Sequence, residues 1–461
     1  MSILRQLTRP QFVVFQVLAQ VPVLRHIHTM KETSEYDFSI ATLGPCKIPS
    51  PKLPSTELDD TIANFARDDQ YILRSSTTDA ATVGHEYDPA WMLEEAGPRE
   101  KIYFVPSHCH AAIVTCGGLC PGLNDVIRAL TRTLWYFYGV ERISGIKYGF
   151  RGFRPEFKLS PRRLNPDIVD DIHNLGGSFL GSSRGHGEVE PIVDALERMN
   201  INVLFTIGGD GTQRASLEIT EEIERRDLKI SCVGVPKTID NDIMFVQRSF
   251  GFDTAVAKAV EAVGAAHIEA KSAPDGIGLV QVMGRDSGFI AAHTTLSTSD
   301  VNFCLIPEVP FVIEGENGLL KRLEKRLDKR GHAVILVAEG AGQNLLNAKD
   351  KTYGHIGPFL KEVIRDYLLD RGREANIRYI DPSYIIRATP AGPADSHYCA
   401  RLGANAVHAA MTGRTACIIG QWSNFLVHVP IRMATYQRKK VNSRGPLWRD
   451  VLESTRQPML I

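Results

Sequence analysis

Residues 203–212 read Val-Leu-Phe-Thr-Ile-Gly-Gly-Asp-Gly-Thr, and this stretch sets the expected fold. Its first five residues, Val203–Ile207, form a short apolar run that is typical of a buried strand in a parallel sheet. A glycine-rich turn follows at once, and open α/β sheets bind ligands where their strands end. Asp210 in this turn has two readings, a simple helix cap or a carboxylate that meets a metal–phosphate group. We favour the second reading.

The same order of strand, turn and helix recurs from Lys101 onward. Further apolar runs that indicate buried strands are Ala111–Thr115, Ile230–Val235, Gly278–Val282 and Ala333–Ala338. Helical stretches between them are Asp125–Tyr138, Pro191–Met199 and Asp253–Ala270. This alternation predicts the α/β class with mostly parallel sheets.

Length and composition exclude several classes of protein. The chain has 461 residues, enough for two or three domains, and its 53 basic and 53 acidic side chains give a formal net charge of zero. Hydrophobic residues make up 43%, which argues against disorder or a coiled coil as the main state. Zero net charge argues against a nucleic-acid partner held by long-range electrostatics. No apolar run reaches the roughly 18 residues that a membrane span needs, so we expect no membrane partner.

The ends of the chain carry basic residues. Residues 1–30 contain no acidic residue, which resembles an organelle-targeting segment, although serine is scarce and Met30 is an equally good start. The eight cysteines form no Cys-x-x-Cys pair, which favours a reducing compartment over a disulfide framework or a zinc site. We therefore predict a cytoplasmic protein, with an organelle as the alternative. The basic C-terminal residues are predicted to form a solvated helical face; they are Arg438, Lys439, Lys440, Arg444 and Arg449.

Three more turns follow predicted strands or lie near them, and each has a structural and a functional reading. Gly117–Gly122 offers free amides at a helix start for an anion, but an ordinary tight turn explains it equally well. Gly181–Gly185 places Arg184 among small residues, where it reaches a phosphate or is simply solvated. Pro236–Asp242 carries two carboxylates beside a hydroxyl and an amine, which suits a general base and a metal ligand.

Other polar positions are easier to interpret. Arg285 and Arg387 each follow an apolar stretch, and a surface ion pair is the ordinary reading for both. Ser287 does not satisfy Gly-x-Ser-x-Gly, so a hydrolase elbow is rejected. His267 and Glu269 lie in a stretch rich in Ala and Val, and we interpret them as structural.

Taken together, these motifs resemble the 6-phosphofructokinase family over Lys101 to Ile431. The motifs that carry the resemblance are Gly-Gly-Asp-Gly-Thr at 208–212, Pro-Lys-Thr-Ile-Asp-Asn-Asp at 236–242 and Met-Gly-Arg at 283–285. The stretch Tyr-Ile-Asp-Pro-Ser-Tyr-Ile-Ile-Arg at 379–387 is similar to the ATP-dependent branch of plants, trypanosomatids and spirochaetes. The resemblance implies a homotetramer of chains with two Rossmann-like three-layer α/β/α domains and an active site in the cleft between them.

The resemblance also implies domain boundaries. Residues 1–95 would be an N-terminal extension, 96–250 an ATP-binding domain and 251–386 a domain that binds fructose 6-phosphate. Residues 387–461 would pack back across both domains.

Carried over to this chain, the resemblance implies an allosteric enzyme that phosphorylates fructose 6-phosphate at its 1-hydroxyl with ATP and Mg²⁺, the committing step of glycolysis. The residues implied to hold ATP are Gly117, Arg184, Gly185, Asp210, Gly211, Thr212 and Lys237. Those implied to hold the sugar phosphate are Thr238, Ile239, Asp240, Met283, Gly284, Arg285, Glu339, Arg378, Tyr384, Ile385, Ile386 and Arg387. Among them Asp240 is the implied general base, with Thr238, Arg184 and Arg285 as further catalytic residues. Asp210 and Asp242 are the implied Mg²⁺ ligands.

The identity of the phosphoryl donor depends on two positions. The family's pyrophosphate enzymes commonly carry Asp where this chain has Gly211, and a carboxylate there would crowd the α-phosphate of ATP. Lys237, in contrast, matches the pyrophosphate enzymes. We favour ATP and keep pyrophosphate as the alternative. Gly276 and Tyr384 stand where bacterial members carry Arg and His, which leaves the 6-phosphate clamp across the subunit interface and the effector open.

Overall fold

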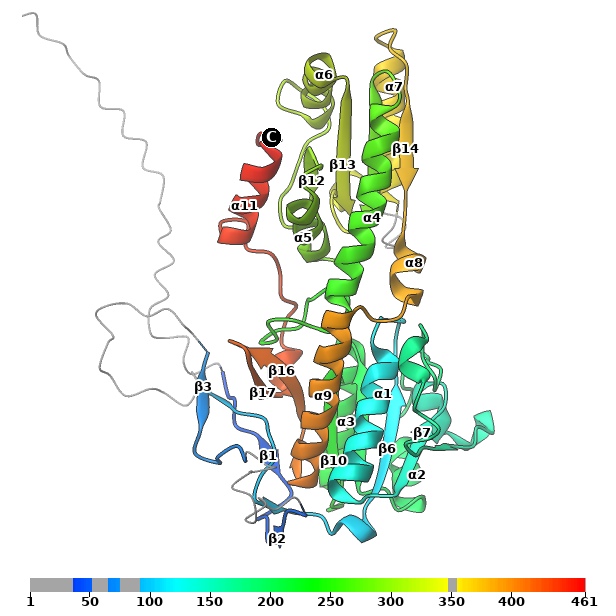
Figure 1. Cartoon of the computed structure of the whole chain (residues 1–461), viewed down its shortest axis with the longest axis vertical. Coiled ribbons are helices and arrows are strands. Elements are labelled where there is room, and N and C mark those ends of the chain that lie inside the picture. Colours follow the sequence, from blue (N-terminus) through cyan, green and yellow to red (C-terminus); the bar gives the residue numbers. More distant parts are fainter. Residues whose placement is uncertain (1–35, 52–64, 75–91, 347–354, 461) are drawn as a thin grey trace, which may run out of the picture.

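The computed structural model describes residues 36–51, 65–74, 92–346 and 355–460. Residues 1–30, considered above as a targeting segment, lie outside the described residues. Two sheets, one of seven strands and one of four, follow one another along the long axis of the molecule (Figure 1).

The larger sheet has seven strands in the order β17-β16-β10-β9-β6-β7-β8. Their bounds are β6 His110–Thr115, β7 Arg142–Ile146, β8 Arg162–Arg163, β9 Val203–Gly208, β10 Ser231–Pro236, β16 Cys417–Trp422 and β17 Phe425–Pro430. The central pairs are parallel, and β8 and β17 run antiparallel to their neighbours.

Both faces of the large sheet are covered, which explains its apolar strands. Ala111 and Ile113 of β6 belong to the core on one side, whereas Ala112 and Val114 belong to the core on the other. Helices α1 (Leu123–Arg132) and α9 (Pro393–Met411) cover the first side, and α2 (Glu190–Arg198) and α3 (Asp210–Arg225) cover the second. A strand buried on both faces has no polar side to show, so it reads as a continuous apolar run.

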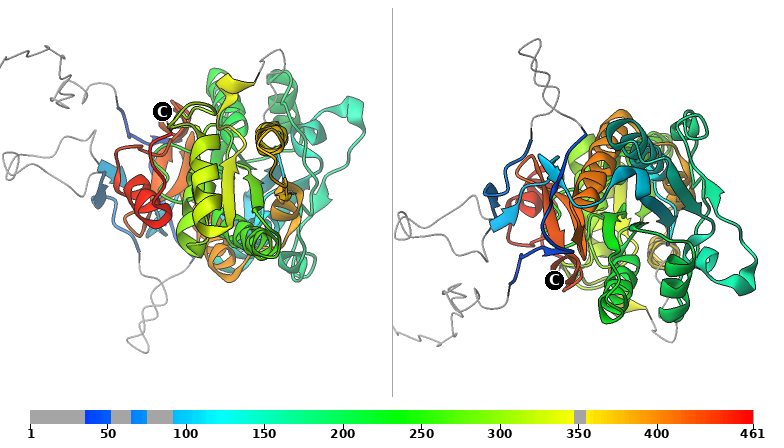
Figure 2. Two further views of the ribbon diagram at one scale, coloured as in Figure 1. Left: turned by 90° about the horizontal axis from the view of Figure 1, so that it is seen from above. Right: turned by 90° about the horizontal axis from the view of Figure 1, so that it is seen from below.

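The smaller sheet has four parallel strands in the order β12-β13-β11-β14. Their bounds are β11 Gly276–Val282, β12 Phe303–Leu305, β13 His332–Ala338 and β14 Ile377–Ile380. Helices on its two faces are α4 Phe252–Lys271 and α5 Phe289–Thr298 on one, and α6 Leu319–Arg330 and α7 Ile356–Leu369 on the other. Figure 2 shows these layers from the end of the molecule, and the short helix α8 (Ser383–Ala388) follows β14.

The fold class predicted from the sequence is confirmed, because each predicted strand and each helix predicted between the strands is present in a mixed α/β structure with mostly parallel sheets. The predicted helix 125–138 differs in its second half, where α1 ends at Arg132 and Thr133–Tyr138 continues as a π-helix. This wider turn ends with Tyr138 buried and its hydroxyl 2.9 Å from Nδ1 of His408 on α9. Short 3₁₀ helices lie at Pro106–His108, Gly149–Phe153, Pro155–Phe157, Ile172–Asn174 and Gln343–Leu345.

Described parts of the N-terminal extension pair with one another and with the large sheet on its β16–β17 side (Figures 1 and 2). The pairs are β1 (Ala41–Thr42) with β15 (Arg414–Thr415), β2 (Ile48–Pro49) with β5 (Lys101–Ile102), and β3 (Tyr71–Leu73) with β4 (Met92–Glu94). Glu95 then forms a β-bridge with Val427 of β17. The edge of the large sheet is thus partly covered, which limits pairing with other chains.

The C-terminal residues contact both sheets. After β17 come the short helix α10 (Ile431–Ala434) and a connection to α11 (Pro446–Thr455), which packs against α5 and β12 of the small sheet. The domain boundaries remain a prediction. All eight cysteines of the chain lie in the described part and are unpaired thiols. In that part no helix has the length and apolar character that crossing a membrane requires.

Candidate active site

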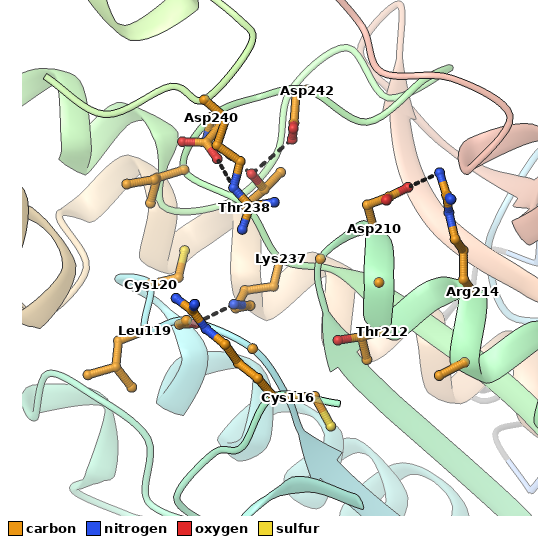
Figure 3. A pocket seen from close by; sticks show the side chains of 18 of the residues that line it. Cys116, Leu119, Cys120, Asp210, Thr212, Arg214, Lys237, Thr238, Asp240 and Asp242 are labelled. Carbon is orange, nitrogen blue, oxygen red and sulfur yellow. Dashed lines mark hydrogen bonds and ion pairs between the residues drawn. The ribbon is translucent and has the colours of Figure 1, made fainter. Parts of the chain in front are cut away.

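One cavity of about 530 Å³ lies where the two sheets meet, at the carboxyl ends of β6, β9, β10 and β11. Figure 3 shows the side chains that line it. All four turns identified in the sequence contribute to its wall, together with Met283 and Arg285 after β11. The strand ends therefore bring together residues that are up to 170 positions apart in the chain.

The first two turns are bonded to each other. The backbone N–H of Gly117 donates to the carbonyl of Ser183 at 2.9 Å, and the Ser182 hydroxyl donates to the carbonyl of Gly117 at 2.6 Å. Gly117 has φ +86°, a left-handed conformation that favours glycine. Arg184 and Gly185 are exposed at the rim of the cavity.

The third turn opens helix α3. Gly209 is the N-cap and Asp210 the first helical residue, and no side chain forms a cap hydrogen bond, so the simple-cap reading of Asp210 is wrong. Oδ1 of Asp210 instead lies 3.3 Å from Nη2 of Arg214 at the wall of the cavity. A Cβ added to Gly211 would meet no atom within 4 Å, so the protein leaves open space beside this residue.

The fourth turn, after β10, is buried and rich in polar contacts. Nζ of Lys237 donates to the carbonyl of Gly118 in the first turn, and burial lowers the pKa of this amine. The Thr238 hydroxyl donates to Oδ1 of Asp242 at 3.0 Å and accepts from the backbone N–H of Asp240 at 3.1 Å. These bonds tie the Thr238 side chain to the carboxylate of Asp242 and to the backbone of Asp240.

Asp240 is the most strongly perturbed carboxyl of the site. The residue is only 6% exposed, its Oδ1 is buried without a hydrogen-bond partner, and its Oδ2 lies 3.6 Å from Nε of Arg285. Burial and then the nearby charge of Asp242 raise the pKa of Asp240 well above its usual range, against the opposing charge of Arg285. A raised pKa makes a carboxylate a stronger base, so Asp240 suits proton abstraction.

The turn after β11 holds Arg285 in an unusual conformation. Its φ is +50°, directly after Gly284 at +145°, and its backbone N–H donates to Oε1 of Glu339 at 2.9 Å. Burial raises the pKa of Glu339. Met283 and Arg285 line the cavity, while Gly284 and Glu339 lie behind them and shape the turn.

The sugar-phosphate residues predicted after β13 are only partly brought to the cavity. Arg387 lines it, but Arg378 lies on β14 with its Nε 3.5 Å from Oε2 of Glu269. Tyr384 is 82% exposed, Ile385 is also exposed, and Ile386 is buried in the core. Within one chain, therefore, Arg378, Tyr384, Ile385 and Ile386 do not line the cavity. The remaining predicted residues, namely Gly117, Arg184, Gly185, Asp210, Gly211, Thr212, Lys237, Thr238, Ile239, Asp240 and Asp242, do.

The sequence analysis missed several residues of the cavity wall. Arg438 was predicted on a solvated helical face, which is wrong, because residues 438–440 lie between α10 and α11 and Arg438 lines the cavity. Lys439 is half-buried in the same stretch, and its Nζ donates to the carbonyl of Val246 at 2.7 Å. Arg214, Phe150 and His186 also line the cavity. His186 directly follows Gly185 and Arg214 lies one helical turn after Asp210, so both are close in sequence to predicted turns. Phe150 and Arg438 reach the site only through packing.

The two residues interpreted as structural, His267 and Glu269, have protein partners, as does Ser287, which was rejected as a hydrolase nucleophile. Nδ1 of His267 lies 3.0 Å from Oδ1 of Asp300. Ser287 is buried and its hydroxyl donates to the carbonyl of Lys439 at 2.7 Å. At Gly276 an added Cβ would overlap the carbonyl oxygen of Ala270, so no side chain fits at this position.

Glycine turns, cationic side chains and a buried carboxylate at the ends of parallel strands define a phosphoryl-transfer enzyme, since that chemistry needs positioning and charge neutralisation. Residues 110–410 match the family described as phosphofructokinase. The chain is 55% identical over 437 residues to an ATP-dependent 6-phosphofructokinase of Borreliella burgdorferi, covering 92% of this chain and 97% of that protein. The chain therefore belongs to the phosphofructokinase family.

More distant relatives point the same way. The chain is 45% identical to an ATP-dependent 6-phosphofructokinase of Trypanosoma brucei brucei, over 79% of this chain and 76% of that one. It is 43% identical to ATP-dependent 6-phosphofructokinase 7 of Arabidopsis thaliana, over 89% and 87%.

Among solved structures, the pyrophosphate-dependent phosphofructokinase of Marinobacter aquaeolei has a TM-score of 0.62 at 21% identity, covering 76% of this chain and 92% of that one. The phosphofructokinase of Pichia pastoris has a TM-score of 0.60 at 21% identity, covering 78% and 37%. At this identity the two structures support the fold.

Proposed function

We propose that this chain transfers the terminal phosphoryl group of ATP to the 1-hydroxyl of fructose 6-phosphate, which gives fructose 1,6-bisphosphate and ADP. The observation that carries the proposal is the place of Asp240, a buried carboxylate with an unpartnered oxygen between the phosphate-binding turns and Arg285. The names of the relatives at 43–55% identity support the same reaction.

Asp240 acts as the general base. Its carboxylate takes the proton of the 1-hydroxyl while that oxygen attacks the terminal phosphorus. The bond from this phosphorus to the bridging oxygen breaks, and ADP leaves with the bonding electrons. The raised pKa of Asp240 supports this role, because a stronger base takes the proton more readily.

Charge on the phosphoryl group is neutralised by cationic side chains and backbone amides. Arg285 lies beside the base, Lys237 beneath the first turn, and Arg184 at the rim. The start of α3 at Asp210–Gly211 presents N–H groups and the positive end of the helix dipole, which suit a phosphate. Thr238 lies beside the base and orients Asp242.

Asp210 and Asp242 are proposed to hold Mg²⁺ together with the phosphates of ATP. Both carboxylates line the cavity, and Mg²⁺ is usually bound by one or two carboxylates, substrate phosphates and water. The oxygen-only donor set of the two residues fits this ion. When bound, Mg²⁺ supplies positive charge that stabilises the phosphates in the transition state.

ATP is the proposed donor because Gly211 leaves room where a carboxylate would meet the α-phosphate. Nothing in the protein fills the space that a side chain would take there. Pyrophosphate remains the alternative because of Lys237, whose amine lies at the same turns.

The sugar phosphate is proposed to lie against Met283, Gly284 and Arg285, with Arg387 at its 6-phosphate. Arg378, Tyr384 and Ile385 stand outside the cavity of one chain. The exposure of Tyr384 and Ile385 supports an assembly that covers them, and we propose the homotetramer. The turn at Thr238–Asp240 and Glu339 are proposed to complete the sugar-phosphate site.

We propose a cytoplasmic location. An organelle is the alternative, since two Arabidopsis relatives are named chloroplastic. Allosteric regulation is proposed from the family resemblance, and no effector is assigned.

The test is phosphorylation of fructose 6-phosphate with Mg²⁺, using ATP and pyrophosphate in parallel reactions. We expect turnover with ATP alone. Turnover with pyrophosphate alone would show that Lys237 outweighs Gly211 and that the donor is wrong. No turnover with either donor contradicts the proposed function. Omitting Mg²⁺ or adding excess EDTA should abolish turnover, which tests the metal separately.

A further inference from the structure

The chain between α10 and α11 crosses from the large sheet to the small one, and we call residues 435–441 the C-terminal strap. Figure 1 shows this crossing as the connection that leads from the β16–β17 hairpin region to α11. The strap runs beside the fourth turn of the site. The backbone N–H of Lys439 donates to the carbonyl of Asp242 at 2.8 Å, and Arg438 forms a β-bridge with Ile243.

The same residues of the strap are bonded to the small-sheet half. The Ser287 hydroxyl donates to the carbonyl of Lys439 at 2.7 Å, and the backbone N–H of Val441 donates to Oε1 of Glu308 at 2.8 Å. Ser287 belongs to the turn that carries Arg285. Adjacent peptide groups of the strap thus hold the turn of the general base on one side and the Arg285 turn on the other.

The side chain of Arg438, at the cavity wall, also contacts both turns. Its Nη1 lies 3.0 Å from Oδ2 of Asp286, and its Nε lies 3.9 Å from Oδ2 of Asp242. The guanidinium is partly buried and lines the cavity wall. One cation is therefore shared between a carboxylate two residues after Asp240 and a carboxylate directly after Arg285.

A further contact ties the strap to the third turn. Nη2 of Arg214 donates to the carbonyl of Thr435 at 3.2 Å, and the same nitrogen lies 3.3 Å from Oδ1 of Asp210. The strap is therefore bonded directly to the turn of Asp242 and, through Arg214, to the turn of Asp210.

We propose that Arg438 is a positioning residue for phosphoryl transfer, which holds the Asp240–Asp242 turn in register with the Arg285 turn through Asp242 and Asp286. This inference rests on the proposed function, because it assigns Arg438 to the same reaction. Arg438 acts through these carboxylates and not through contact with the substrates. Displacing reacting groups by about 1 Å costs on the order of 10²-fold in rate, so loss of this link should slow the chemical step.

The test compares Arg438→Ala and Arg438→Lys with Arg444→Ala, an arginine of the same basic stretch that is exposed outside the cavity wall. We expect Arg438→Ala to lower kcat about 10- to 100-fold while both KM values change less than about threefold. Arg438→Lys should restore part of the rate, because lysine keeps the charge but lacks the planar fork. Arg444→Ala should behave as wild type.

A second measurement separates positioning from general damage. ATP binding by calorimetry and the thermal midpoint should stay near wild type in both Arg438 variants. Asp286→Asn should lower kcat in the same direction, and the double variant with Arg438→Ala should lose less than the product of the two single losses, because both remove one link.

The outcomes distinguish the inference from the proposed function. A wild-type chain that uses neither donor overturns both. An active wild type with Arg438→Ala within about twofold in kcat overturns the role of Arg438 alone, as does a variant that raises KM at unchanged kcat. If Arg438→Ala does not fold, the size-conserving Arg438→Lys and Asp286→Asn decide: wild-type kcat in both overturns the inference, and reduced kcat in both supports it.

Discussion

At the scale of single residues, the chemistry of the site depends on where each carboxylate lies. Asp240 and Asp242 are two residues apart, yet Asp242 accepts a hydrogen bond from Thr238 and Asp240 keeps an oxygen without a partner. Burial beside a second negative charge raises the pKa of Asp240, whereas its counter-charge Arg285 comes from the other sheet. One turn thus carries both the proposed base and a proposed metal ligand.

The role of Asp240 predicts the effect of its removal. Asp240→Ala should lower kcat about 10²-fold or more, since a positioned base contributes roughly 10²–10⁴ in rate. ATP binding, measured by calorimetry, should be retained because the phosphate turns stay intact. Asp366→Ala, on the exposed side of α7, serves as the control and should leave kcat unchanged. Near-normal turnover of Asp240→Ala would remove this residue from the base role.

Gly211 predicts donor specificity. Gly211→Asp should abolish turnover with ATP, because the carboxylate would occupy and charge the open space beside the α-phosphate. The fold should persist, since an added Cβ meets no protein atom within 4 Å. Gly211→Ala tests size without charge and should keep much of the ATP activity. Parallel assays with ATP and pyrophosphate measure both variants, and unchanged ATP turnover in Gly211→Asp would contradict the argument.

At the scale of elements, helix packing sets how closely α1 and α9 approach. A Cβ added at Gly403 of α9 would lie 2.6 Å from Cβ of Ala129 on α1, which is closer than real side chains come. Gly264 in α4 is a matched helical glycine where an added Cβ meets nothing within 4 Å. Replacing glycine with alanine should therefore change stability in opposite directions in the two helices.

We expect Gly403→Ala to destabilise the protein by about 1–3 kcal/mol, because overpacking forces the two helices apart. Gly264→Ala should stabilise it by about 0.5–1 kcal/mol, since alanine restricts the unfolded chain and favours the helix. Urea unfolding of both variants and the wild type measures the difference. Equal effects in the two variants would show that the α1–α9 contact is not tight.

The stability of the whole molecule depends on pH through His408. It is buried beside Tyr138 in the contact between α9 and the π-helix, and burial lowers the pKa of its imidazole to about 3. The unfolded chain binds this proton near pH 6.5, so the stabilisation is fully present above that pH and is lost as pH falls from about 6.5 toward 3.

The free energy of unfolding should therefore fall by about 1.4 kcal/mol per pH unit below pH 6 on account of His408. Urea unfolding of the wild type and His408→Gln between pH 7.5 and 4.5 measures this slope, and other titrating groups cancel in the comparison. The variant should show the shallower slope by about one proton. Identical slopes would mean that His408 is protonated in the folded protein.

The fold class and most residues of the cavity wall could be predicted from the sequence alone, because their signals lie close together in the chain. A strand buried on both faces must be apolar throughout, and the turn that ends it needs glycines and polar groups, so both signals lie within about ten residues, as at Val203–Thr212. The acidic turn at Pro236–Asp242 was found in the same way, whereas the role of Arg285 was implied by the family resemblance. Lys237–Asp240, Asp242 and Arg285 line the cavity.

Which distant residues lie beside these turns depends on the tertiary structure. Arg438 follows β17 in a basic stretch without periodicity, and its place between Asp242 and Asp286 results from the strap crossing both sheets. Arg378 has the residue type of a phosphate clamp but points to Glu269 within one chain. Such contacts join residues 109 and 152 positions apart in the chain, and no short-range pattern of side chains encodes that geometry.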